Sequence, residues 1–219
     1  MTRSGRNVPA PAADLVVVTA ICFGWFILLS LHAVAANFPS EPFTDGVFLE
    51  IITIEFVLAA AALGYLRVRG YDLRRLLPKP TIADSLVGVG LFVAAWIASS
   101  LLSAAVGNPA RSAEPIGEMV AQASISFAPL LSVAIVNGLY EETFLVGYLQ
   151  DALQATGASF ALGVSALVRV LYHLYQGPTG ALSALVFGVV LGVFYLATRR
   201  LWPLVFAHIM ADVLGFALG

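Results

Sequence analysis

Six ionisable side chains in the C-terminal part of the chain have the types and the spacing for acid–base chemistry. They are Glu141, Glu142, Arg169, His173, His208 and Asp212. The first two are adjacent, and the other four form two pairs whose members lie four residues apart, on one face of a helix. Because a charged group at bilayer depth costs about 2.5–3.5 kcal/mol on insertion scales, such groups usually face a bundle interior. Their apolar surroundings therefore predict one polar site enclosed among helices.

Carboxylates and imidazoles in one shielded site are suited to hydrolysis by an activated water. A carboxylate can act as a general base on water, and histidine can donate to an oxyanion, move a proton or bind a metal. Glu141 would supply the base and Asp212 an orienting carboxylate. His173 and His208 would supply the imidazoles, so the inventory predicts water-mediated peptide hydrolysis. Glu142 points about 100° away from Glu141 on a helix, so we expect it to play a different part.

The composition is that of an integral membrane protein. Of the 219 residues, 60% are hydrophobic and 11% are charged, whereas soluble domains are about 45–50% apolar and about 25% charged. We therefore expect the lipid bilayer as a partner and no nucleic acid. The single cysteine, Cys22, excludes a disulfide within the chain and a cysteine zinc site.

The apolar stretches predict an all-α fold, a polytopic transmembrane bundle of about seven spans. A bilayer core needs about 20 apolar residues per helix. On this basis the spans are residues 14–36, 47–66, 83–106, 125–149, 158–175, 180–198 and 201–218. Prolines and glycines fall between these spans, as expected at helix boundaries. No polar stretch is long enough for a second, soluble domain, so we expect residues 1–219 to form a single integral membrane domain.

The basic residues predict a cytoplasmic N-terminus, because basic side chains are more frequent on the cytoplasmic side of membrane proteins. With the N-terminus inside, that side carries Arg3, Arg6, Arg67, Arg69, Arg74, Arg75, Lys79, Arg199 and Arg200. Only Arg111 would lie outside, and an odd number of spans would place the C-terminus outside as well. A compact chain of this kind suits a plasma membrane, which it would cross several times.

The first apolar run imitates a secretion signal, because two arginines precede it and residues 33–35 read Ala-Val-Ala. The apolar part of a signal peptide is about 7–15 residues long, and this run is longer. We therefore interpret it as a retained first helix, with cleavage as the alternative.

The six ionisable residues lie in three short motifs. Residues 141–149 read Glu-Glu-Thr-Phe-Leu-Val-Gly-Tyr-Leu, residues 169–173 read Arg-Val-Leu-Tyr-His, and residues 208–212 read His-Ile-Met-Ala-Asp. In order and spacing they resemble the CAAX-processing and bacteriocin-processing intramembrane protease family, also called the Abi family. Its motifs are Glu-Glu-x-x-x-Arg, often continued by Gly-Tyr-Leu, then Phe-x-x-x-His, and then His-x-x-x-Asn or Asp. The resemblance covers residues 125–219, which we expect to be the protease core.

Two positions depart from the family pattern. Val146 stands where the family has arginine, and Arg169 stands where it has phenylalanine. One physical account joins both changes: the positive charge has moved to the next helix and pairs there with Glu142. A lone buried carboxylate would otherwise protonate or destabilise the fold. We therefore expect an ion pair between Glu142 and Arg169, with Glu141 free to act on water.

The resemblance also implies a role for each remaining residue. Glu141 would activate the water, and His173 would orient that water or stabilise the oxyanion. His208 with Asp212 would complete the stabilisation. A divalent metal such as zinc is an open alternative, held by Glu141, His173 and His208. Because neither His-Glu-x-x-His nor another compact zinc spacing is present, we assign no metal ligand from the sequence.

Other polar residues in the apolar stretches have more than one interpretation. Glu55 lies deep in the second span and could line the same cavity. Tyr172, Tyr175 and Gln176 flank His173, where they could line a substrate path or anchor the helix at the membrane interface.

The leading functional hypothesis is an intramembrane endopeptidase that hydrolyses a peptide bond in a peptide or membrane-protein substrate. The alternative is a non-catalytic family member that acts as a membrane scaffold or an immunity protein. A proton-coupled transporter would also place ionisable residues within its spans. Transporters of that kind often contain an internal repeat, and the sequence shows none.

Overall fold

The computed structural model describes residues 12–38, 42–105 and 115–217, and within these ranges the chain is helical and contains no strand. By length and composition, five helical stretches can cross a membrane: Ala12–Ala35, Asp45–Val68, Ile82–Ala105, Phe127–Thr156 and Ala158–Thr198. A shorter apolar helix, Trp202–Ala217, follows them. The protein is an all-α membrane helix bundle, as the composition predicted.

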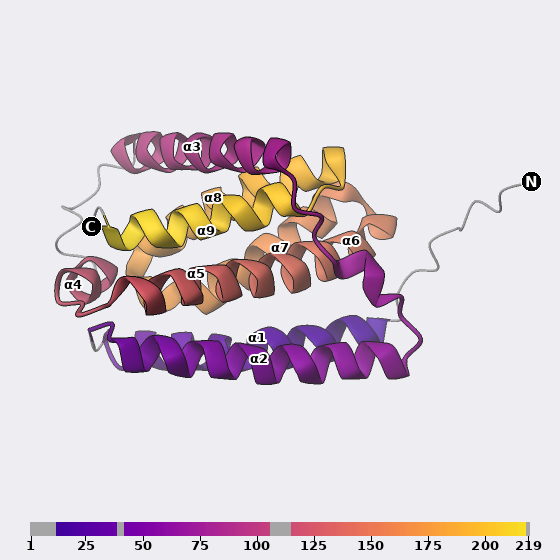
Figure 1. Ribbon diagram of the computed structural model, residues 1–219, viewed down its shortest axis with the longest axis horizontal. Coiled ribbons are helices and arrows are strands. Elements are labelled where there is room, and N and C mark those ends of the chain that lie inside the picture. Colours follow the sequence, from indigo (N-terminus) through magenta and orange to yellow (C-terminus); the bar gives the residue numbers. More distant parts are fainter. Residues whose placement is uncertain (1–11, 39–41, 106–114, 218–219) are drawn as a thin grey trace, which may run out of the picture.

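In chain order the structure contains α1 (Ala12–Ala35), α2 (Asp45–Val68), the 3-10 helix η1 (Leu73–Leu76), α3 (Ile82–Ala105), α4 (Pro115–Ala121), α5 (Phe127–Glu141), the π-helix η3 (Glu142–Gln150), α6 (Asp151–Leu153), the 3-10 helix η4 (Gln154–Thr156), α7 (Ala158–His173), the 3-10 helix η5 (Leu174–Gln176), α8 (Gly177–Thr198) and α9 (Trp202–Ala217). The seven expected spans correspond to α1, α2, α3, α5 with η3, α7, α8 and α9. The 41-residue stretch Ala158–Thr198 holds two of them, because the chain reverses at Gly177. The φ of Gly177 is 86°, a value that glycine adopts without steric strain. As a result α7 and α8 pack against each other (Figure 1).

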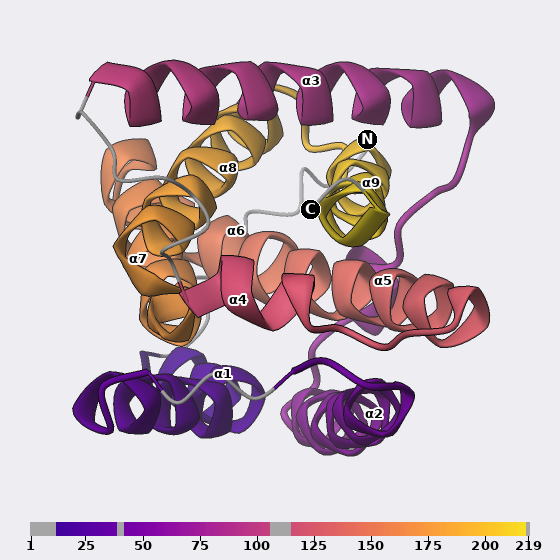
Figure 2. The same ribbon diagram turned by 90° about the vertical axis from the view of Figure 1, so that its left-hand side faces the viewer.

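The helices are stacked in layers, with the site helices in the middle (Figure 2). α1 and α2 lie side by side in an outer layer and pack on α7 and α5, respectively. On their other side α5 packs on α9 and α7 packs on α8, and α3 crosses over both α8 and α9. Because all six candidate residues come from α5, η3, α7 and α9, they are covered by helices on both sides.

Small residues let α9 approach its neighbours closely. A Cβ atom on Gly88 of α3 would lie 2.8 Å from the Pro203 carbonyl oxygen. A Cβ atom on Gly138 of α5 would lie 3.2 Å from the Val205 carbonyl oxygen and 3.4 Å from His208 Cβ. Such close backbone approaches are typical of helix packing in lipid, where no hydrophobic effect drives helices together. α9 is therefore held between α3 and α5, with His208 against the last turn of α5.

The described basic residues outside the site gather at one end of the bundle, where α2 leads into η1 and α8 turns into α9 (Figure 1). Ion pairs at this end join Arg69 to Asp14, Arg199 to Asp151 and Arg200 to Asp84. Arg3, Arg6 and Arg111 lie outside the described residues. Basic residues gathered at one end are expected in a membrane protein, because they are more frequent on the cytoplasmic side. The cytoplasmic position of the N-terminus stays a prediction.

Thiol labelling tests which end of the bundle faces the cytoplasm. A cysteine replacing Lys79, exposed at the basic end, should react with a membrane-impermeant maleimide only after cells are permeabilised. A cysteine replacing Gly46, exposed in the first turn of α2 at the opposite end, should react in intact cells. Cys22 is fully buried, so the parent chain supplies the background. The reverse labelling pattern would contradict the predicted orientation.

Candidate active site

The two adjacent glutamates lie at a change of helix type. α5 ends at Glu141 and continues directly into the π-helix η3, which begins at Glu142. π-helical turns are rare and are often found at functional sites. At its other end η3 is held by Gln150, whose amide donates to the Gly192 carbonyl of α8 at 2.9 Å. The Gln150 carbonyl accepts from the Ser165 hydroxyl of α7 at 2.8 Å. These bonds fix η3, and with it the glutamates, against α7 and α8.

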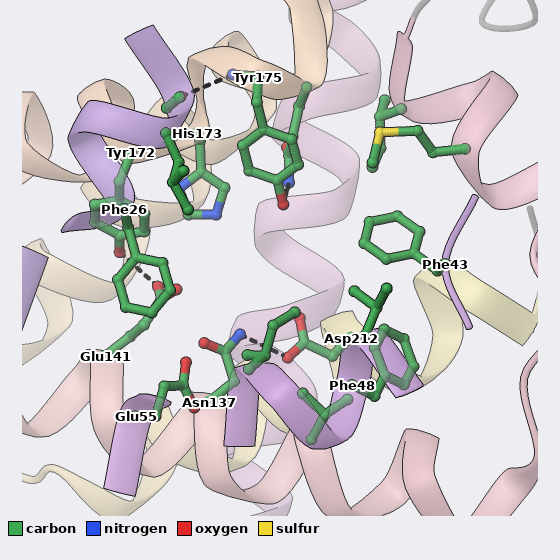
Figure 3. A pocket seen from close by; sticks show the side chains of 18 of the residues that line it. Phe26, Phe43, Phe48, Glu55, Asn137, Glu141, Tyr172, His173, Tyr175 and Asp212 are labelled. Atoms are coloured by element: carbon green, nitrogen blue, oxygen red, sulfur yellow. Dashed lines mark hydrogen bonds between the residues drawn. The ribbon is translucent and has the colours of Figure 1, made fainter. Parts of the chain in front are cut away.

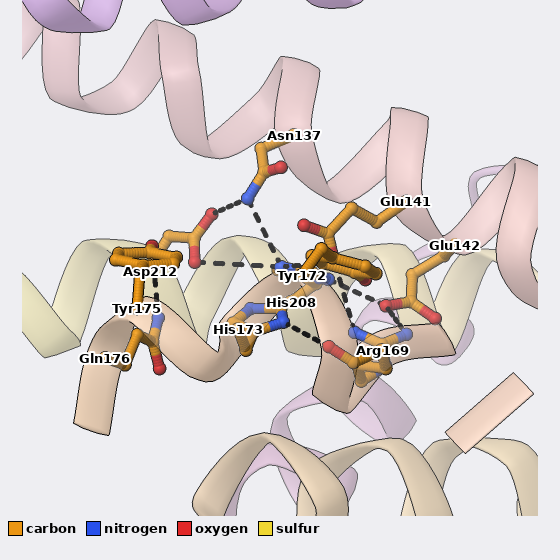
Figure 4. Close-up of polar contacts among 10 residues, drawn as sticks. All are labelled: Asn137, Glu141, Glu142, Arg169, Tyr172, His173, Tyr175, Gln176, His208 and Asp212. Atoms are coloured by element: carbon orange, nitrogen blue, oxygen red, sulfur yellow. Dashed lines mark hydrogen bonds and ion pairs between the residues drawn. The ribbon is translucent and has the colours of Figure 1, made fainter. Parts of the chain in front are cut away.

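Arg169 of α7 pairs with both glutamates (Figure 4). Its Nη2 lies 2.7 Å from Glu142 Oε1, and its Nη1 lies 3.2 Å from Glu141 Oε2. The ion pair between Glu142 and Arg169 that the sequence predicted is therefore present. All three residues are buried, and Val146, which occupies the arginine position of the family pattern, is buried in the apolar core. A charge at this depth needs an opposite charge beside it, and the guanidinium supplies it.

Glu141 is less free than the sequence suggested, because one of its two oxygens is fully engaged. Oε2 accepts from Arg169 and, at 2.5 Å, from the Tyr172 hydroxyl. Two adjacent buried carboxylates share the one nearby guanidinium, so neither is left without a positive partner. The other oxygen, Oε1, accepts no hydrogen bond from a described residue, and Glu141 borders a cavity. One oxygen is anchored, and the other can meet a water or a substrate.

His208 of α9 completes the cluster. Its Nδ1 lies 2.7 Å from Glu142 Oε1, so the carboxylate accepts the Nδ1 hydrogen and fixes the ring. Its Nε2 faces Glu141 Oε2 at 3.9 Å and Asp212 Oδ1 at 3.7 Å. Asn137 of α5 donates to Asp212 Oδ2 at 3.0 Å. The structure thus brings one imidazole nitrogen to within 4 Å of carboxylates from both α5 and α9.

His173 lies at the edge of this hydrogen-bonded cluster. Its Nδ1 lies 2.9 Å from the Arg169 carbonyl oxygen, four residues earlier on α7. A carbonyl oxygen only accepts, so Nδ1 carries a hydrogen and Nε2 is the acceptor of the neutral ring. Among the contacts of the described residues, no hydrogen bond joins His173 to Glu141 or His208. His173 is therefore positioned by its own helix in the wall of the site.

Two cavities meet at the cluster. One, of about 680 Å³, lies among α1, α2, α5 and α9 and is called here the α1–α2 cavity (Figure 3). The other, of about 820 Å³, lies among α3, α4, α8 and α9 and is called the α3–α8 cavity. His173 and Asp212 line both cavities. Glu141 lines the first, whereas Arg169 and His208 line the second. The polar groups therefore form a partition between two mostly apolar spaces.

Two contributors to the cluster were not assigned from the sequence. Asn137 lies four residues before Glu141, on the same face of α5, and that spacing is the signal that could have identified it. Tyr172 was expected only to line a path or to anchor the helix, yet its hydroxyl donates to Glu141. It follows Arg169 by three residues, so both side chains reach the same glutamate from one face of α7.

The arrangement also bears on metal binding. Among the described residues, one group of ligand atoms lies within 4.8 Å of one another, and it comes from Glu141, Glu142 and His208. The set anticipated from the sequence had His173 in the place of Glu142. Arg169 already contacts both glutamates, so a divalent cation in this group would meet a fixed positive charge. The charge distribution therefore argues against a metal at this point.

Residues 123–214 match the family model described as type II CAAX prenyl endopeptidase Rce1-like. Over this segment, which is less than half of the chain, the protein is similar to the CAAX protease family. The matched residues include all six candidate residues, with α5, η3 and α7 and with α9 as far as residue 214. No curated protein and no solved structure gives a match. This similarity supports a general role as a CAAX-type membrane protease.

Breaking the shared ion pair should destabilise the fold. Arg169→Gln would leave two buried carboxylates without their cation, and removing one partner of a buried pair costs about 3–5 kcal/mol. The double variant Arg169→Gln/Glu142→Gln should recover much of this loss, because it removes charge on both sides. Unfolding in detergent, followed by circular dichroism, measures both variants. Equal stability of Arg169→Gln and the parent protein would show that the pair is not required.

Gly188 of α8 leaves the space that Arg169 occupies. A Cβ atom on Gly188 would lie 2.8 Å from Arg169 Cδ and 2.9 Å from Nε, and the guanidinium cannot move aside without losing its carboxylates. Gly188→Ala should therefore lower the free energy of unfolding by about 1–3 kcal/mol. The matched control is Gly64→Ala on α2, where the added Cβ meets no atom within 4 Å. That substitution should be neutral or slightly stabilising, and equal losses in the two variants would contradict the steric argument.

Proposed function

We propose that the protein is an intramembrane endopeptidase in which Glu141 activates the attacking water. The observation that carries this proposal is the asymmetry of the Glu141 carboxyl group. Oε2 is held by Arg169 and Tyr172, while Oε1 has no such bond and the residue borders the α1–α2 cavity. A water bound to Oε1 would give a proton to it as the water oxygen attacks a peptide carbonyl carbon. Because the carboxylate is fixed, the water it binds would be fixed as well.

The remaining steps would use groups of the same cluster. The attack places negative charge on the carbonyl oxygen, which the Nε2–H of a protonated His208 would stabilise, with the ring oriented by Glu142. When the carbon–nitrogen bond breaks, the proton held by Glu141 passes to the leaving amine and the carboxylate is restored. His173 would accept a hydrogen bond from the water through Nε2 and so orient it. Asp212 would help to orient the Nε2 edge of His208 from one turn further along the same helix.

We propose that this reaction takes place without a metal. Arg169 already supplies a positive charge next to both carboxylates, a position that a catalytic cation would otherwise occupy. The alternative is a zinc ion held by Glu141, Glu142 and His208, the one group with the required spacing among the described residues. That ion would polarise the peptide carbonyl or the water, and the residues would have to release Arg169 to hold it.

The substrate of this proposed reaction is a peptide or a membrane-protein segment that arrives through the apolar cavities. The α1–α2 cavity extends to Trp25 and the α3–α8 cavity to Trp96, which are 51% and 57% exposed. In a bilayer these side chains face lipid, so a segment embedded in the membrane could reach the cluster between neighbouring helices. The prenylated substrates in the name of the matched family are not part of this proposal.

The non-catalytic alternative has an observation in its favour. The carboxylates, the guanidinium and the imidazole are paired with one another, as they would be in a purely structural network. Such a network would hold α5, α7 and α9 together in a membrane scaffold or an immunity protein. The two functions differ in one measurable property, the dependence of a cleavage activity on Glu141.

Cleavage of a peptide library tests the proposal. The purified protein in detergent should cut apolar peptides, with products identified by mass spectrometry, and Glu141→Gln should lower kcat by about 10²–10⁴-fold because it removes the general base. Asp72→Asn, which removes one negative charge at the N-cap of η1, is the control and should keep the parent activity.

Three outcomes of this experiment are decisive. Cleavage that persists in folded Glu141→Gln would exclude the glutamate mechanism. A folded parent protein that cuts no peptide in the library would favour the scaffold. Activity that disappears with a zinc chelator and returns with zinc would replace the metal-free reaction by the zinc alternative.

A further inference from the structure

Glu55 of α2 is buried in the wall of the α1–α2 cavity without a hydrogen-bond partner. The residue is 3% exposed, and its Oε2 accepts no hydrogen bond from any described residue. Glu55 lines the same cavity as Asn137 and Glu141 (Figure 3). A buried carboxyl group without a partner costs free energy, so the missing donor calls for an explanation. The cavity in front of Glu55 is the place from which such a donor can come.

The other acidic groups of this cavity do not share this property. Glu141 and Asp212 both accept hydrogen bonds from neighbouring side chains. Glu50, one to two turns nearer the start of α2, is exposed. Of the described residues that line the cavity, four are acidic and none is lysine or arginine. The α1–α2 cavity is therefore lined by acidic side chains without a lysine or arginine among these residues, and Glu55 is its buried acidic group without a cation or a donor.

Aromatic rings form much of the wall around these acidic groups. Phe23 stacks on Tyr172 with their ring centroids 5.2 Å apart. Tyr140 meets the rings of Phe23 and Phe26 edge-on, at centroid distances of 6.0 and 6.4 Å. Aromatic faces attract ammonium and guanidinium groups, most strongly where water is excluded. The methylene groups of a lysine or arginine side chain would pack on the same walls.

We propose that Glu55 binds a cationic group of the substrate, an amine or a guanidinium, and that the α1–α2 cavity is the subsite that selects it. This proposal rests on the proposed peptidase function. The cavity volume of about 680 Å³ lies in the range of small-molecule sites and admits one such group beside the scissile bond. Glu55 is a positioning residue in this scheme: it sets which peptides are cut, while Glu141 performs the proton transfer.

Matched peptides test the charge preference. A peptide that the protein cleaves is synthesised with lysine or with norleucine at each position flanking the scissile bond, and with a free or an acetylated N-terminus. At least one cationic member should be cut with a kcat/KM about 10-fold or more above that of its neutral analogue, as expected for a charge-assisted hydrogen bond. The position of the effect distinguishes a side-chain cation from a terminal amine. Equal rates in every pair would overturn the proposal and leave the peptidase function intact.

Glu55→Gln assigns the preference to this residue. The substitution keeps the shape of the side chain and removes its charge, so the ratio of cationic to neutral rates should fall toward one while the neutral peptide is still cut. Asp72→Asn removes a carboxylate at the basic end of the bundle, at a residue that does not line the cavity, and should keep the parent ratio. If Glu55→Gln does not fold, Glu55→Asp keeps the charge on a shorter side chain and should reduce the ratio. A ratio unchanged in the folded variant would overturn the assignment.

Binding of a small cation separates this proposal from the peptidase function. Phenethylammonium and its neutral analogue 2-phenylethanol are added to the protein in detergent, and the Tm is measured. The ammonium should raise the Tm saturably in the parent and in Asp72→Asn, but not in Glu55→Gln, whereas the alcohol should not distinguish the variants. A Tm shift of this pattern in a protein that cuts no peptide would refute the peptidase function alone. Absence of the shift together with absence of a charge preference would refute the cation site.

Discussion

One guanidinium shared by two adjacent carboxylates is the interaction on which the polar centre of this protein depends. Arg169 is buried among apolar helices and contacts both Glu141 and Glu142. None of these charges could be buried alone, because the cost of desolvating an isolated ion exceeds what apolar surroundings return. The contacts join α7 to the junction of α5 and η3, and His208 brings in α9 through Glu142. These ion pairs and hydrogen bonds thus join three helices at one point. They matter because no hydrophobic effect drives helices together within a lipid bilayer.

The same network gives two neighbouring glutamates different environments. Glu142 is fully buried and contacts Arg169 and His208 through one oxygen. Glu141 directs one oxygen into the network and is bordered by a cavity on its other side. A reactive site needs groups that are held rigidly and also one polar atom without a permanent partner. Glu141 meets both requirements with its two oxygens, while Glu142, the next residue, lies entirely within the buried network at the point where the α-helix becomes a π-helix.

Local features of the sequence predicted much of this arrangement. Apolar stretches of helical length predicted the spans, and the four-residue spacing of Arg169/His173 and of His208/Asp212 predicted that each pair shares a helix face. The ion pair between Glu142 and Arg169 followed from a charge balance, because a buried carboxylate needs a cation and Val146 does not supply one. This argument predicts that a positive charge must lie near a buried carboxylate, but it does not predict which atoms are in contact. It could not show that the same guanidinium also reaches Glu141, which depends on where two helices cross.

The sequence by itself determined the membrane class, the approximate limits of the helices and the set of side chains that had to find partners inside the bundle. Only the tertiary structure decided those partners: the Tyr172 hydroxyl donates to Glu141, and the Asn137 amide donates to Asp212. It also showed that Glu55 faces a cavity. The physical reason is that helices in lipid are apolar on nearly every side, so their pattern does not encode how each is rotated about its axis. Those rotations follow from close approaches at small residues, and they bring together groups that lie far apart in the chain.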